Sequence, residues 1–217
     1  MSMRLRLIGA VAVFSCSARG AQEWPEFRGP GGQGHSKETG LATTWSEKEN
    51  VRWKTPIPGR GWSSPAILGE RIWVTTATEG GRSLRAVGVE RETGKIVVDV
   101  EVFRLSNAGT IHEKNSPASP TPVLEGDRVY VHFGPQGTAC LKASGEVVWK
   151  TRLEYAMGHG PGGSPVLHED LLIVSCDGTD VQYVVALEKA SGKVRWKKNR
   201  DGLMAYSTPL VVDGQLI

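Results

Sequence analysis

The chain has few cysteines, no extended basic run and no apolar run long enough to cross a membrane. Its 217 residues include 3 cysteines, and none of these has the Cys-x-x-Cys spacing that favours zinc or redox chemistry. The net charge is only +3, and no basic run is longer than that at residues 197–200, so nucleic-acid binding has no electrostatic support. The apolar run at residues 7–14 is too short to span a bilayer.

The first 21 residues have the features of an export signal. Arg4 and Arg6 form a short basic segment, and the apolar run follows directly. Two processing routes remain open. Residues 13–16 resemble a lipobox that would place a lipid on Cys16, whereas the small residues at 16–20 suit ordinary signal-peptide cleavage. Either route predicts a protein of the periplasm or cell envelope, with an outer-membrane anchor if Cys16 is lipidated.

Glycine and proline are abundant, and this predicts an all-β chain. There are 27 glycines and 12 prolines, which implies many turns between short strands. Four segments also begin alike, with serine or threonine before proline and then an apolar strand pattern. The prolines of these starts are 57, 43 and 44 residues apart, near the roughly 40–50 residues of a four-stranded propeller blade. They are Ser64-Pro65, Thr121-Pro122, Ser164-Pro165 and Thr208-Pro209.

Each unit divides into four short strands, of which the second unit is the clearest example. We expect its strands at 121–124, 128–133, 138–142 and 146–151. The apolar residues alternate within these runs, as half-buried strands require. Asp127 and the Ser144-Gly145 pair mark tight turns.

Two cysteines remain if Cys16 belongs to the signal segment. Cys140 and Cys176 lie within predicted strands of different repeats. A disulfide between them would require Cα atoms within about 7 Å of each other. We therefore predict two buried small hydrophobic residues, with pairing in an oxidising compartment as the alternative.

Two units end in Ser-Gly-x-x-x-Trp, and this motif resembles the tryptophan-docking motif of the PQQ-type repeat. That repeat is shared by quinoprotein dehydrogenases and by the propeller lipoprotein of the outer-membrane β-barrel assembly machinery. In the family, the tryptophan stacks between adjacent blades. The resemblance implies docking by Trp149 and Trp196, with Val98 in the tryptophan position of the first unit. It assigns docking roles to Trp53, Trp149, Trp196, Gly94, Gly145 and Gly192.

The resemblance also implies a domain organisation. Family propellers close with seven or eight blades, so residues 51–217 would form an incomplete propeller of about three to four blades, truncated within a blade. Residues 51–54 resemble the outer strand of the blade that closes the ring. Residues 22–50 would form an N-terminal arm packed on the propeller. We expect the protein to be a monomer.

The loops that join successive blades are the candidate binding rim. In such a propeller they gather at one mouth of the central channel, and here they are rich in tryptophan, histidine, asparagine and arginine. Convergent polar groups on a concave rim suggest a binding site. The alternative is that these residues only fill the mouth of the central channel and bind nothing. The candidates are Arg60, Trp62, His112, Lys114, Asn115, His159 and Tyr206.

Other motifs are weaker. The matches to Gly-x-Gly-x-x-Gly at residues 29–34 and 158–163 contain prolines and open no predicted helix, so we reject a phosphate-binding role. The adjacent pair His112 and Glu113 would point in opposite directions on an extended chain, which argues against a shared acid–base role. No set of residues forms an evident catalytic constellation or metal site.

The sequence therefore favours an exported scaffold that binds a protein or a small ligand at its rim, without a cofactor. The alternative is a PQQ-dependent alcohol or sugar dehydrogenase, which would use PQQ with Ca²⁺. The resemblance implies vicinal cysteines and clustered oxygen ligands for such an enzyme. This sequence has no Cys-Cys pair, and Glu113 with Asn115 cannot supply the six to eight oxygens of a calcium shell.

Overall fold

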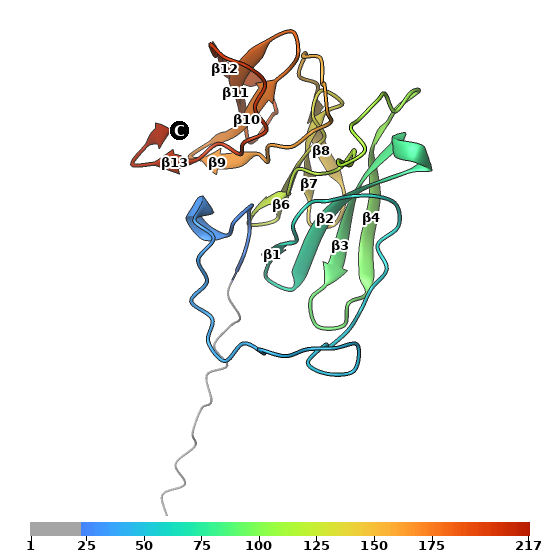
Figure 1. Ribbon diagram of the computed structural model, residues 1–217. Coiled ribbons are helices and arrows are strands. Elements are labelled where there is room, and N and C mark those ends of the chain that lie inside the picture. The colour runs from blue at the N-terminus through green and yellow to red at the C-terminus, as the bar shows by residue number, and fades with distance from the viewer. Residues whose placement is uncertain (1–22) are drawn as a thin grey trace, which may run out of the picture.

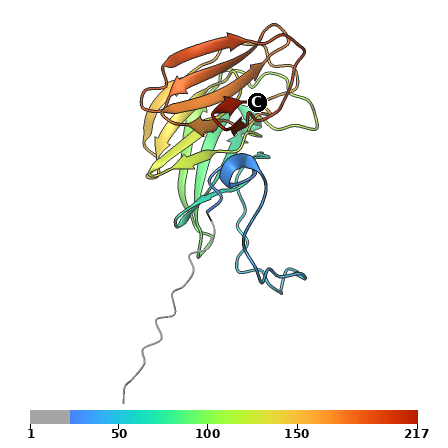
Figure 2. The same cartoon turned by 90° about the vertical axis from the view of Figure 1, so that its left-hand side faces the viewer.

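The computed structural model describes residues 23–217. The expected export signal at residues 1–21, with Cys16, lies outside the described residues. The described chain forms three four-stranded antiparallel sheets and one two-stranded sheet. In Figure 1 the sheets follow one another in chain order, and Figure 2 shows them side by side, each twisted relative to the next. This is the expected all-β architecture of propeller blades.

Each four-stranded sheet is a simple meander, in which every strand pairs with its sequence neighbour. The first blade contains β1 (Ala66–Leu68), β2 (Arg71–Thr78), β3 (Ser83–Glu90) and β4 (Ile96–Arg104). The second contains β5 (Val123–Glu125), β6 (Arg128–His132), β7 (Thr138–Lys142) and β8 (Val147–Thr151). The third contains β9 (Val166–His168), β10 (Leu171–Asp177), β11 (Gln182–Glu188) and β12 (Val194–Asn199).

The remaining elements are one hairpin and two short turns. The strands β13 (Val211–Val212) and β14 (Gln215–Leu216) form the hairpin after the third blade. Two short 3-10 turns, η1 (Pro30–Gly32) and η2 (Glu79–Gly81), are the only helical elements within residues 23–217. Neither is long and apolar enough to cross a membrane.

The apolar core lies between the blades, because the middle strands of the second blade present apolar side chains on both faces. In β6, Val129 and Val131 pack into the cluster shared with the first blade, whereas Tyr130 packs into the cluster shared with the third. In β7, Leu141 and Cys140 divide in the same way. Successive residues of a strand point to opposite faces, so a strand between two neighbouring blades must be apolar at nearly every position.

The N-terminal arm adds a short pairing to the inner strands. Trp24 and Ile67 of β1 exchange two backbone hydrogen bonds, at 2.9 and 2.8 Å. The next residue, Pro25, accepts a bond of 2.8 Å from the Leu124 amide of β5. The arm therefore lies against the inner edges of two blades. Residues 29–34 then turn through η1, and no α-helix follows either glycine-rich segment in the described chain.

A chain of hydroxyl contacts joins the starts of successive blades. The backbone amide of Ser64 donates to Thr121 Oγ1 at 3.0 Å, and that of Thr121 donates to Ser164 Oγ at 2.9 Å. The amide of Ser164 in turn donates to Thr208 Oγ1 at 3.0 Å. The repeated serine or threonine before proline thus links each blade to the next.

Candidate functional site

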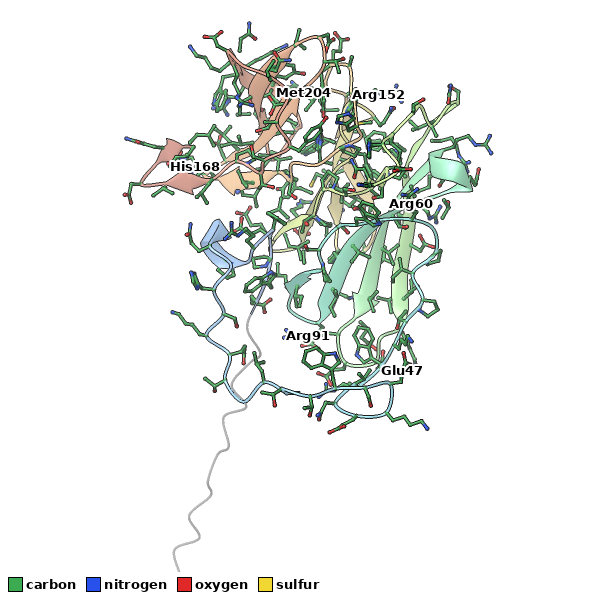
Figure 3. All side chains as sticks on the ribbon, viewed as in Figure 1. Glu47, Arg60, Arg91, Arg152, His168 and Met204 are labelled. Carbon is green, nitrogen blue, oxygen red and sulfur yellow. The ribbon has the colours of Figure 1, made fainter. Side chains whose placement is uncertain are left out.

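The loops between blades meet at one end of the sheets. Arg60 lies at this end of the first blade, and Arg91 lies at the opposite end (Figure 3). The Arg60 guanidinium donates to the Glu113 carbonyl at 2.8 Å, which joins the first two loops. The His112 amide donates to the His159 carbonyl at 3.2 Å, and the Tyr206 hydroxyl lies 3.2 Å from His159 Nδ1. Four loops that are distant in sequence are therefore in direct contact.

The contact between these loops frames a shallow, open surface cavity of about 360 Å³, which we call the rim cavity. Three successive inter-blade loops contribute to it, so no single blade could form it. Five of the seven predicted rim residues line this space. The lining residues are His112, Lys114, Asn115, His159, Gly162 and Tyr206.

Two imidazoles and a phenol form an aromatic wall. The rings of His112 and His159 are 5.4 Å apart and nearly perpendicular, at 78°. The Tyr206 ring lies 6.0 Å from that of His159. His112 Nδ1 accepts a bond of 3.1 Å from the Lys114 amide, so a neutral His112 carries its proton on Nε2. The Lys114 ammonium has no hydrogen-bond or ion-pair partner among residues 23–217.

Asn115 holds the loops together. Its side-chain amide donates to the carbonyls of His159 and Pro161, at 2.9 and 3.1 Å. Its carbonyl oxygen accepts from the Ser116 amide at 2.8 Å and from the Ser119 hydroxyl at 2.6 Å. The two donors and the two acceptor positions of the side chain are thereby used. Asn115 lines the rim cavity but has no spare polar group for a ligand.

Arg60 and Trp62 lie outside the rim cavity. The Arg60 guanidinium is 5.4 Å from the centre of the Trp62 ring, within the range of a cation–π contact. Arg60 lines a second cavity, of about 460 Å³, with Ile111 and Glu79. Hydrogen bonding from Arg104 lowers the pKa of Glu79, so this carboxylate is already engaged. Residue 111 faces this second cavity and residue 112 faces the rim cavity, so the loop divides the two.

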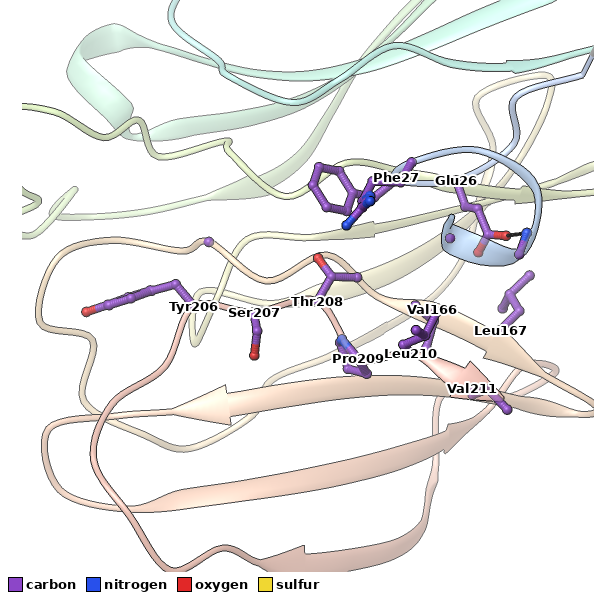
Figure 4. A pocket seen from close by; sticks show the side chains of 14 residues that line it. Glu26, Phe27, Val166, Leu167, Tyr206, Ser207, Thr208, Pro209, Leu210 and Val211 are labelled. Carbon is purple, nitrogen blue, oxygen red and sulfur yellow. Dashed lines mark hydrogen bonds between the residues drawn. The ribbon is translucent and has the colours of Figure 1, made fainter. Parts of the chain in front are cut away.

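A third cavity lies between the N-terminal arm and the start of the fourth unit. It measures about 440 Å³, and its lining includes Glu26, Arg28, Thr208 and Tyr206 (Figure 4). Glu26 Oε1 accepts a bond of 3.0 Å from the Gly31 amide, and burial raises the pKa of its carboxyl group. Tyr206 lines both this cavity and the rim cavity.

The blades are joined by residues that dock onto glycines of the following blade. Trp53 covers Gly94, where an added Cβ would lie 2.5 Å from the indole. The indole Nε1–H of Trp53 donates to the Arg91 carbonyl at 2.9 Å. Trp149 repeats the arrangement, covering Gly192 and donating to the Lys189 carbonyl at 2.8 Å. Residues 51–54 form no strand, although Trp53 is docked as Trp149 is.

The same position is filled differently in the other two units. Val98 and Val100 lie over Gly145 in place of an indole. Trp196 is partly buried and packs against the cluster of Val166, Ile173 and Ala186. Docking onto a glycine of the following blade is thus seen for Trp53, Trp149 and the Val98 position, with different side chains.

Comparison with known proteins identifies the repeat. A family model described as outer membrane protein assembly factor BamB matches residues 136–217. Residues 136–217 thus match the PQQ-like propeller repeat, and the described chain has the fold of propeller blades. No curated protein sequence is significantly similar to the chain.

Two solved structures have the same propeller fold. BamB from Moraxella catarrhalis matches with a TM-score of 0.51 and 20% identity, over 73% of this chain and 45% of that one. A europium-containing methanol dehydrogenase matches with a TM-score of 0.50 and 15% identity, over 66% of this chain and 25% of that one. The chain therefore spans less than half the length of either structure. At these identities the likeness shows the fold alone.

Sequence reasoning did not single out two buried polar residues of the PQQ-like blades. His132 ends β6 and Asp177 ends β10, both on the side of the inter-blade loops. They are 2% and 7% exposed. The available signal was a polar residue at the end of an otherwise apolar strand, next to a rim loop.

Proposed function

We propose that this protein is an exported β-propeller scaffold whose rim cavity binds a segment of another protein. The observation that carries the proposal is the convergence of His112, Lys114, His159 and Tyr206 from three loops on one cavity of about 360 Å³. A preformed concave site with a few convergent polar groups is the common form of a recognition site.

The side chains of the rim cavity favour a partner that offers hydrogen-bond acceptors. The Lys114 ammonium is a donor without a partner in the described chain, and a neutral His112 presents its Nε2–H group. The histidine and tyrosine rings add apolar contact area at small entropic cost, as aromatic residues do at interfaces. The matching family is described as an assembly factor, which supports a protein partner.

The proposed location is the periplasm or cell envelope. Residues 1–21 would direct export, and a lipid on Cys16 would tether the propeller to the outer membrane. Replacing Cys16 with serine distinguishes the two processing routes. A lipidated chain would move from the membrane fraction to the soluble fraction, whereas an ordinarily cleaved chain would stay in the soluble fraction.

The quinoprotein alternative requires a site for Ca²⁺, and the residues of the rim cavity do not fit one. Calcium takes six to eight oxygen ligands. The rim cavity instead presents imidazole and ammonium nitrogens and one phenol, and the Asn115 carbonyl oxygen already accepts two hydrogen bonds. We therefore propose binding without PQQ or Ca²⁺ at this cavity.

Site-specific crosslinking tests the proposal. A photoreactive phenylalanine analogue in place of Tyr206, in the full-length exported protein, should give one defined adduct in intact cells. The same analogue at Val97, an exposed position on β4, is the matched control and should not. The adduct should be lost with Lys114→Glu and retained with Lys95→Glu. An adduct of equal yield from Val97, or none from Tyr206, would overturn the proposal.

A titration of the same protein with PQQ and Ca²⁺ tests the alternative. We expect no saturable change in cofactor absorbance and no dye-linked oxidation of alcohol or glucose. Stoichiometric binding accompanied by turnover would replace the scaffold proposal with the enzymatic one.

A further inference from the structure

A small, partly open hollow adjoins the rim cavity. It measures about 20 Å³, and its lining includes His132, Tyr155, Ser175, Asp177 and Tyr206. Gly162 and Tyr206 line both this space and the rim cavity. The small space is therefore separated from the rim cavity by a wall that includes the Tyr206 ring.

Asp177 lines this space and carries an unpartnered acceptor. Its side chain is only 1% exposed, and Oδ1 accepts a hydrogen bond from Arg200 Nη1 at 2.5 Å. The second oxygen, Oδ2, is buried and has no hydrogen-bond partner. Buried polar atoms in folded proteins are nearly always paired, so an unpaired carboxylate oxygen points to an occupant that donates to it.

The surroundings restrict the chemistry of that occupant. A volume of about 20 Å³ admits a single non-hydrogen atom with its hydrogens. Burial lowers the pKa of His132 to about 4, so its imidazole is neutral and adds no positive charge beside Asp177. His132 Nδ1 is engaged with Thr138 Oγ1 at 2.8 Å. An O–H or N–H group therefore satisfies the free oxygen, and an anion does not.

We infer that this space is a subsite for the terminal hydroxyl or ammonium group of the molecule bound at the rim, such as a side chain of the bound segment. The inference rests on the proposed binding function of the rim cavity. Tyr206 forms the shared wall and is 40% exposed, so displacement of its ring opens the route between the two spaces.

Small probes test the subsite directly. With ¹⁵N-labelled histidine in the full-length exported protein, the ring nitrogens of His132 report on occupancy. Ethylammonium and ethanol carry the two donor types, and acetonitrile is a control of similar size that has no donor. We expect a saturable His132 shift with one or both donors in the millimolar range, as such small ligands allow. Acetonitrile should cause none.

Two variants decide whether Asp177 is responsible. Asp177→Asn replaces the free acceptor with an amide and should weaken probe binding at least tenfold, with the other histidine signals unchanged. If that variant fails to fold, Tyr206→Ala at the exposed wall provides the second measurement, because it should speed exchange of the probes. Equal binding by Asp177→Asn would overturn the role of its free oxygen. No saturable shift in either wild type or Tyr206→Ala would mean that the space admits only water.

The two experiments distinguish failure of the subsite from failure of the rim proposal. Loss of the crosslink at Tyr206 with a retained His132 response would overturn rim binding of a protein and leave the donor subsite. If the wild type shows no His132 response to the probes and Asp177→Asn retains the crosslink at equal yield, the subsite is overturned and rim binding stands.

Discussion

The indole of Trp149 lies over Gly192 in the neighbouring blade, and its Nε1–H donates to the Lys189 carbonyl at 2.8 Å. One side chain thus supplies both apolar contact and a hydrogen bond across the boundary between two sheets. The nearby Thr151 hydroxyl adds a bond of 2.7 Å to the Gly192 carbonyl. Because the blades share no backbone ladder, contacts of this kind hold them in register.

Removing this indole should destabilise the chain strongly. Trp149 is 8% exposed, and Trp149→Ala should lower the free energy of unfolding by about 3–5 kcal/mol. Trp149→Phe keeps a ring but leaves the Lys189 carbonyl without its donor, and should cost about 1–3 kcal/mol. Denaturant unfolding measures both. Trp45→Ala, at a position that is 70% exposed, should change stability by less than about 0.5 kcal/mol.

Gly192 and Gly126 separate backbone strain from collision with the indole. Both have positive φ, at 70° and 58°, but an added Cβ at Gly126 meets nothing within 4 Å. Gly126→Ala should therefore cost about 1–2 kcal/mol, the penalty of the left-handed conformation. Gly192→Ala should cost about 1–3 kcal/mol more, because its Cβ overlaps Trp149. Equal costs in denaturant unfolding would show that the indole contact contributes little.

The sequence predicted the strands because alternating apolar residues and turn residues are local features. The four strands expected in the second unit match β5 to β8 with shifts of at most two residues. The first begins later than expected because Thr121 donates its amide to Ser164, and Pro122 has no amide hydrogen to donate. Alternation could not tell which blade each face meets, since that depends on the order of the blades around the ring.

The rim was harder to derive because its geometry arises between loops. Sequence placed His112, His159 and Tyr206 in different loops, but their contact depends on how three blades are oriented. Asn115 was expected to offer polar groups, and the structure shows all of them engaged by neighbouring loops. Arg200 pairs with only one carboxylate oxygen of Asp177 and leaves the other without a partner. No spacing rule in the sequence predicts this arrangement.

The hydroxyl of Ser164 should contribute measurably to the free energy of unfolding, although the side chain is small. It is 3% exposed and accepts the Thr121 amide at 2.9 Å. Ser164→Ala would leave that amide buried and unpaired, at a cost of about 1–3 kcal/mol. Ser164→Thr should retain most of the stability, since threonine fills the equivalent role at positions 121 and 208. If the alanine and threonine variants unfold at the same denaturant concentration, the inter-blade hydroxyl bond is not stabilising.

His132 should make the fold sensitive to acid. Burial lowers its pKa from 6.5 to about 4, so on acidification the unfolded chain takes up this proton before the folded chain does. Above pH 6.5 His132 is neutral in both states and carries no penalty. As the pH drops toward 4, the free energy of unfolding falls by up to about 3 kcal/mol. His132→Gln should flatten the pH dependence of unfolding in that window. Val131→Ala, which removes buried methyl groups nearby, should lower stability equally at each pH.

The two buried thiols should be unreactive in the folded protein. Burial raises the pKa of Cys140 to about 11 and that of Cys176 to about 12, and the thiolate is the reactive form. Both cysteines are free and lie in the core between the second and third blades. In a Cys16→Ser chain, an aromatic disulfide reagent should label neither thiol natively and both in denaturant. Rapid native labelling would contradict the packing, and no labelling in denaturant without reductant would show a disulfide.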